Sequence, residues 1–137
     1  MEKTVQEYLD SINPTQTIID RVYYLKQYGE NFYGLTFPSI FLSTDNEDNQ
    51  LQYKSLFLFS SEYIVEFKDF LNKIDVDLSK ITSKIEYFEM FDSIDKEQKL
   101  KIHISLAFNM SCTFFAQGAN CTYLQILAKK YLIPNMK

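Results

Sequence analysis

The chain has 137 residues, a length typical of one domain, and its 46% hydrophobic and 23% charged content is that of a globular protein, which excludes charge-driven disorder. Eighteen Asp and Glu against fourteen Lys and Arg give a net charge of -4, so the chain repels phosphate backbones and nucleic acid is not an expected partner. We therefore expect a single domain over residues 1–137 whose unusual feature is its twelve Phe and ten Tyr.

Two helices are predicted at the start of the chain. Thr4 and Glu7 form a capping box ahead of apolar positions, which predicts a helix that ends near Ile12. Asn13 and Pro14 supply a second helix start, and a left-handed C-cap is expected at Gly29. Residues 14–28 are therefore predicted as a helix, although their β-branched and aromatic content leaves a strand open.

Two strands and a third helix are predicted next. The alternation over 32–42 predicts a strand that Pro38 interrupts, as at a sheet edge or bulge. After a polar loop at 45–50, the apolar run that ends 51–59 is typical of a central strand buried on both faces. A helix is then predicted from Ser60 or Ser61, with an apolar face and an opposite acidic face formed respectively by Ile64, Phe67, Phe70, Leu71 and Ile74 and by Glu62, Glu66 and Asp69.

The remaining third of the chain predicts further strands and a last helix. A polar connection over 75–83 precedes a strand at 85–91, and a turn at 92–98 precedes a strand in which apolar residues alternate from Leu100 to Phe108. Residues 111–133 are either one helix with an internal Gly118, or a strand at 112–117 followed by a helix capped by Asn120. Both alternatives place four residues on an apolar helix face: Tyr123, Leu124, Leu127 and Tyr131.

These elements predict an α+β fold. We expect a single antiparallel sheet of four to five strands, packed by N-terminal, central and C-terminal helices. The chain shows no signal-peptide pattern at its start and no run of 18 apolar residues, which predicts a cytoplasmic protein that does not enter a membrane. Two cysteines, Cys112 and Cys121, fit reduced thiols in that compartment.

The groups capable of catalysis or metal binding are few. His103 is the only histidine and is a natural general base, and Cys112 is a nucleophile that it could activate, but no third group to orient them is identifiable. A zinc site at His103, Cys112 and Cys121 would have spacings of nine and nine residues, unlike the short pairs that zinc sites use. We expect no catalytic residue, no metal site and no cofactor.

Tyrosines are the better candidates for function. Ten of them cannot all be buried with partners for their hydroxyl groups, and tyrosine is favoured at protein interfaces because it gives large contact area at low entropic cost. Several lie close together at the end of the second predicted helix. The predicted partner-binding residues are Tyr28 and Tyr33 with the acidic loop residues Asp45, Glu47 and Asp48.

The leading functional hypothesis is a non-catalytic protein-binding module. It would neutralise or mask one partner protein, which is a toxin, an effector or a target enzyme, as small acidic immunity proteins and inhibitors do. The first alternative is an acidic secretion chaperone, for which a homodimer is expected. The second alternative is a small enzyme that uses His103 or Cys112.

Overall fold

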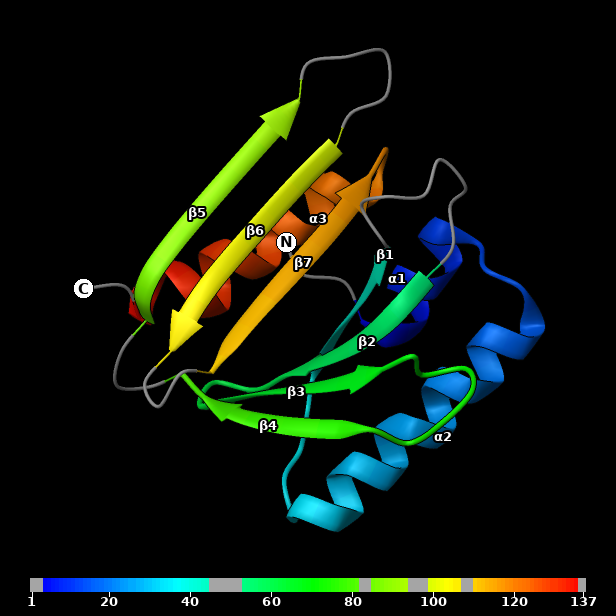
Figure 1. Cartoon of the computed structure of the whole chain (residues 1–137). Coiled ribbons are helices and arrows are strands. Elements are labelled where there is room, and N and C mark those ends of the chain that lie inside the picture. Colours follow the sequence, from blue (N-terminus) through cyan, green and yellow to red (C-terminus); the bar gives the residue numbers. More distant parts are fainter. Residues whose placement is uncertain (1–3, 45–52, 82–84, 94–98, 107–109, 136–137) are drawn as a thin grey trace.

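A computed structural model describes residues 4–44, 53–81, 85–93, 99–106 and 110–135 (Figure 1). Its elements in chain order are α1 (Val5–Ile12), α2 (Gln16–Tyr33), β1 (Ser39–Thr44), β2 (Tyr53–Phe59), β3 (Tyr63–Lys68), β4 (Val76–Lys80), β5 (Ile85–Ser93), β6 (Lys99–Leu106), β7 (Ser111–Gln117) and α3 (Asn120–Leu127). After α3 the chain continues through a π-helical turn, Ala128–Leu132, and a 3-10 turn, Ile133–Asn135. The predicted α+β class is confirmed.

The strands form two antiparallel sheets. One has four strands in the order β1-β2-β3-β4 and the other has three in the order β5-β6-β7. Figure 1 shows α2 along the first sheet, α3 behind the second, and β7 at the junction of the two sheets. The predicted antiparallel sheet of four to five strands is thus confirmed in part: the first sheet has four antiparallel strands, but the strands do not form a single sheet. The sequence predicts a helix and a polar connection where the chain forms β3 and β4.

The predicted third helix, from residue 60 onward, is a hairpin strand instead. Ser60 Oγ accepts hydrogen bonds from the backbone N–H groups of Tyr63 (3.0 Å) and Glu62 (3.4 Å), which closes a tight turn between β2 and β3. Ile64 and Val65 are then both fully buried, one on each face of β3. Because both faces of this sheet are covered, apolar residues occur at odd and even positions, and this pattern resembles helical spacing.

The predicted helix over 14–28 is confirmed as a helix, but its ends are shifted. Thr15, rather than Asn13, is the N-cap and accepts from the N–H of Ile18. The left-handed C-cap is Gly34 at φ 66°, not Gly29. Gly29 lies within the helix against β2, where a Cβ atom would stand 3.1 Å from Leu58 Cδ1. Residues 32 and 33 are consequently helical, and β1 begins only after Pro38.

The most regular sequence patterns are confirmed. In β2, residues 56–59 are buried in succession between β1 and β3, as expected of a central strand. In β6, Leu100, Ile102 and Ile104 are buried and alternate with half-buried neighbours. The C-terminal part follows the alternative of a strand and then a helix, although Ala119 rather than Asn120 occupies the cap position. The predicted loop at 45–50 lies outside the described residues.

The two sheets share one hydrophobic core. Phe114 of β7 packs among three rings of the first sheet, with centroid separations of 4.4 Å to Phe57, 5.7 Å to Phe59 and 6.2 Å to Phe41. The backbone N–H of Phe115 also donates to Ser43 Oγ of β1 (2.9 Å). Between the described strands of the two sheets there is no ladder of backbone hydrogen bonds, so these contacts join the sheets through side chains.

Tyr8 and Asn120 cover the outer edge of β1. The hydroxyl of Tyr8 accepts from the N–H of Leu42 (3.0 Å) and donates to Asn120 Oδ1 (2.8 Å), and Asn120 Nδ2 donates to the carbonyl of Leu42 (3.0 Å). Leu42 therefore has its outward backbone groups satisfied without another strand, which closes an edge that is otherwise open to pairing. Among the helices of the described ranges, none combines the length and the apolar content needed to cross a bilayer.

Candidate functional site

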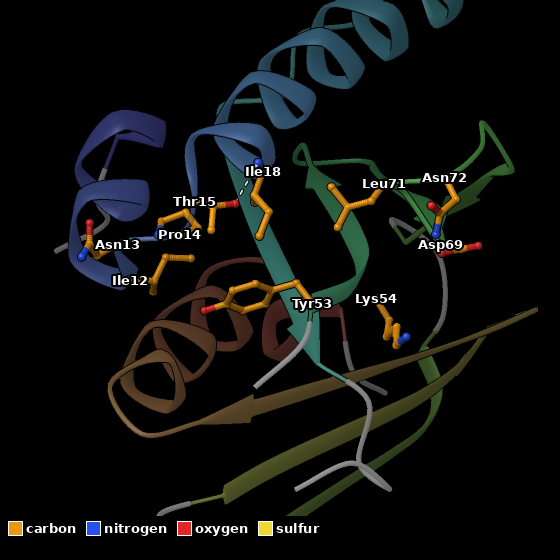
Figure 2. Close-up of a pocket in the computed structure, with 10 residues that line it drawn as sticks. All are labelled: Ile12, Asn13, Pro14, Thr15, Ile18, Tyr53, Lys54, Asp69, Leu71 and Asn72. Atoms are coloured by element: carbon orange, nitrogen blue, oxygen red, sulfur yellow. Dashed lines mark hydrogen bonds between the residues drawn. The ribbon is translucent and has the colours of Figure 1, made fainter. Parts of the chain in front are cut away.

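A hollow of about 440 Å³ lies at the N-terminal end of α2 (Figure 2). Four segments contribute to its wall: the α1–α2 connection, the first turn of α2, the start of β2 and the turn between β3 and β4. Its lining residues are Ile12, Asn13, Pro14, Thr15, Ile18, Tyr53, Lys54, Asp69, Leu71 and Asn72. Figure 2 shows Ile12, Ile18, Tyr53 and Leu71 turned toward the hollow from these different segments, so its inner surface is largely apolar and its margin is polar.

The corner between α1 and α2 has a defined backbone. Asn13 adopts the left-handed conformation at φ 48°, and its N–H donates to the carbonyl of Leu9 (2.9 Å), which ends α1. Pro14 cannot donate, and Thr15 then caps α2. Because three successive residues have restricted backbone angles or capping bonds, one wall of the hollow is held in place before any ligand binds.

The opposite wall is the turn between β3 and β4. Asp69 has φ 49°, and its carbonyl accepts from the N–H groups of Asn72 (3.0 Å) and Lys73 (3.3 Å), while its carboxylate accepts from Asn72 Nδ2 (2.8 Å). The N–H of Phe70 donates to the carbonyl of Lys54 at the start of β2 (3.3 Å). The turn is thus tied both to itself and to the neighbouring strand.

Arg21, the only arginine of the chain, joins this turn to α2. Its Nε donates to the carbonyl of Phe70 (2.7 Å) and its Nη2 to the carbonyl of Lys73 (3.3 Å), while the guanidinium lies 5.4 Å from the centroid of the Tyr24 ring. A second hollow of about 370 Å³ opens beside it, lined by Thr17, Asp20, Arg21, Tyr24 and Leu71. The two hollows share Leu71, and we refer to them together as the α2 groove.

Exposed apolar side chains gather around the α2 groove. Among the described residues six large apolar side chains are exposed, and four of these belong to the first part of α2 or to the β3–β4 turn: Tyr23, Tyr24, Leu71 and Ile74. The other two are Phe32, at the far end of α2, and Ile133, near the C-terminus. Neighbouring exposed apolar side chains of this kind are a feature of binding surfaces, whereas most proteins expose such residues singly.

The predicted partner-binding tyrosines lie at the other end of α2. Tyr28 and Tyr33 are half-buried and form an aromatic cluster with Phe32: the Tyr28 ring stacks on Phe32 at 5.9 Å, and Phe32 meets Tyr33 edge-on at 5.0 Å. Tyr28 also contacts Phe67 of β3. Helical rise places this cluster about 20 Å along the axis from the first hollow. Asp45, Glu47 and Asp48 lie outside the described residues.

His103 and Cys112 do not meet. His103 pairs with Thr113 and Cys112 with Ile104 in the β6–β7 ladder, and because side chains alternate across a sheet, the imidazole and the thiol are on opposite faces. His103 Nδ1 lies 2.7 Å from Thr113 Oγ1. Burial, reinforced by the Glu66 carboxylate, raises the pKa of Cys112 to about 12, so the thiol stays protonated at neutral pH.

The predicted acidic face at Glu62, Glu66 and Asp69 is wrong, since these residues do not share a helix. Glu66 lies on β3 and is half-buried, and burial raises its pKa while Ser55 Oγ donates to its carboxylate (3.4 Å). In the part of the chain that the structure describes, no three His, Cys, Asp or Glu side chains are grouped as metal ligands.

Sequence reasoning missed the residues that build the α2 groove. The sequence predicts Leu71 on the buried face of a helix, and its only signal for Arg21 is that this residue is the single arginine and precedes two tyrosines. No protein-family model, curated protein or solved structure matches this chain.

Proposed function

We propose that this protein is a non-catalytic binding module that neutralises or masks a partner protein, in the manner of immunity proteins and inhibitors. The observation that supports the proposal is the concentration of exposed apolar side chains around the α2 groove. Tyrosine, leucine and isoleucine side chains exposed next to a preformed hollow are the arrangement by which protein interfaces bury aromatic or aliphatic anchors.

The chemistry of the groove favours an anchoring side chain from the partner. In the first hollow, Ile12, Ile18 and Leu71 offer apolar contact, while Lys54 and Asp69 at its margin offer polar contacts that orient the ligand. Arg21 holds the turn against α2 before binding, which lowers the entropy lost on association. The net charge of -4 favours a partner with a basic surface, because opposite charges accelerate encounter.

Affinity capture with the full chain, from a lysate of the source cells, tests the proposal. The bait is compared with the double variant Tyr24→Ala/Leu71→Asp and with Ile133→Ser, a matched control that removes the exposed apolar side chain remote from α2. The captured protein is then purified and titrated by calorimetry. We expect a loss of affinity of about 100-fold in the double variant and none in the control.

Two results would contradict this assignment. A captured protein whose affinity is the same for the double variant and the wild type binds elsewhere, and Tyr28→Ala and Tyr33→Ala in the same titration then test the sequence-predicted surface. A partner whose own activity is unchanged when the chain saturates it is not neutralised, and this would reject the masking role.

A further inference from the structure

β4 has an open edge. It is the outer strand of the four-stranded sheet, and of the described elements only β3 is hydrogen-bonded to it (Figure 1). The bonds from Lys68 N to Asp75 O (3.0 Å) and from Ile81 N to Glu62 O (2.8 Å) show that odd-numbered residues face β3. Because the backbone groups of an antiparallel strand alternate in direction, those of Val76, Leu78 and Lys80 point to the open edge.

We propose that a second copy of this chain pairs with β4 in antiparallel orientation, about a two-fold axis at Leu78, so that the two four-stranded sheets become one continuous sheet. The proposal concerns a different surface from the α2 groove and does not depend on the proposed function. In this arrangement Leu78 exchanges backbone hydrogen bonds with its own symmetry mate, and Val76 exchanges them with Lys80 of the second copy.

The charges on β4 select this register. Symmetric pairings that bring outward backbone groups together are centred at Asp77, Leu78 or Ser79. Centring at Asp77 sets two carboxylates directly opposite each other, which destabilises a strand pair. Centring at Ser79 leaves only three β4 residues opposite β4 of the second copy. At Leu78 all five residues are paired, and Asp77 faces the uncharged Ser79 while Lys68 of its own chain neutralises it (2.9 Å).

Apolar side chains also continue across the proposed interface. Val76 and Leu78 are half-buried and lie on the same face as Phe67, against which α2 packs through Gly29. Pairing places Leu78 next to Leu78 and Val76 next to the aliphatic stem of Lys80. The aromatic cluster lies close to β4, because its Tyr28 ring contacts Phe67 at 6.3 Å and Phe67 is the cross-strand partner of Val76. Phe32 of that cluster is 64% exposed and offers contact area beyond the strands.

Sedimentation equilibrium of the full chain tests the dimer directly. We expect the mass to rise with concentration from 16.2 kDa toward twice that value. Leu78→Lys and Leu78→Glu each place two like charges at the axis, and each is expected to raise the dissociation constant about tenfold or more. An equimolar mixture of these two variants is expected to form the dimer again, because the charges at the axis are then opposite. Ile133→Lys is the control for added charge and leaves the constant unchanged.

A second variant separates loss of pairing from loss of folding. Lys80→Pro removes an N–H that points to the open edge and leaves the β3–β4 ladder intact, so circular dichroism is unchanged while the dimer weakens. A wild type that stays at 16.2 kDa across the concentration range overturns the proposal. The proposal is also overturned if Leu78→Lys and Lys80→Pro leave the dissociation constant of the dimer unchanged. It is overturned as well if the mixture of Leu78→Lys and Leu78→Glu associates no more strongly than either variant alone.

Discussion

Tyr8 shows how one buried hydroxyl connects three distant segments. It lies on α1, bonds to the backbone of β1 and to Asn120 at the start of α3, and stacks on Tyr123 with centroids 4.0 Å apart. Burial raises the pKa of Tyr8 well above its usual value, so the hydroxyl stays protonated and keeps its donor. Burial of a hydroxyl costs little free energy when both of its hydrogen-bond partners are present. Removing the hydroxyl leaves those partners buried without a hydrogen bond, which lowers the stability of the fold.

Tyr8→Phe is therefore expected to lower the free energy of unfolding by about 1–3 kcal/mol, because the N–H of Leu42 and Oδ1 of Asn120 each lose a hydrogen-bond partner inside the protein. Urea titration measures the change. The matched control is Tyr23→Phe, whose hydroxyl donates to Gln6 at the surface and whose loss should cost less than about 0.5 kcal/mol. Equal losses in the two variants would show that the β1 edge does not depend on Tyr8.

Among the elements, the sequence predicts those that carry a clear local signal, such as a capping residue or a regular alternation. The capping box at Thr4 and the alternation of β6 identify their elements because the pattern and the environment agree. The sequence does not predict β3, because a strand buried on both faces can carry apolar residues at any spacing. Ile64 and Phe67 are three positions apart, which is also the spacing along one face of a helix. The groove could not be predicted, since the contact of Arg21 with Phe70 spans 49 residues and depends on that hairpin.

Arg21 gives a prediction about the β3–β4 turn. Arg21→Lys replaces the guanidinium group, which donates to two carbonyl groups of the turn, with a single ammonium group. We therefore expect the backbone amides of Phe70, Asn72 and Lys73 to exchange hydrogen about tenfold faster, with little change in global stability. Hydrogen exchange read by mass spectrometry measures this. Lys26→Met is the control, because it removes the ion pair with Glu30 (3.0 Å) on the same helix away from the turn. Unchanged exchange in Arg21→Lys would mean that the turn is held by its own bonds.

At the scale of the whole molecule, the single-domain prediction concerns how the two sheets are coupled. In the part of the chain that the structure describes, they are joined by side-chain contacts, including those of Phe114 and the bond from the Phe115 N–H to Ser43, and not by a shared ladder. Cooperative unfolding of both sheets must then come from side-chain packing in the common core.

Phe114→Ala is expected to lower the free energy of unfolding by about 3–5 kcal/mol, because the ring fills the space among Phe41, Phe57 and Phe59. Urea unfolding followed by far-ultraviolet circular dichroism and by tyrosine fluorescence measures both stability and cooperativity. The exposed Phe32 provides the control: Phe32→Ala should change stability far less. Two separate transitions in the wild type would contradict a single domain.

The bonds among Tyr8, Leu42 and Asn120 also bear on biosynthesis. A ribosome adds roughly 5–20 residues each second, so about ten seconds pass between translation of Tyr8 and of Asn120. In the later part of that interval, once β1 and β2 have been made, the nascent chain lacks the Asn120 amide that accepts from Tyr8 and donates to the Leu42 carbonyl, and the apolar run of β2 lies beside that uncovered strand. Newly made chains therefore pass through a period in which a strand edge and its hydrophobic neighbour are available to other nascent proteins, and it ends only when the last helix has been made.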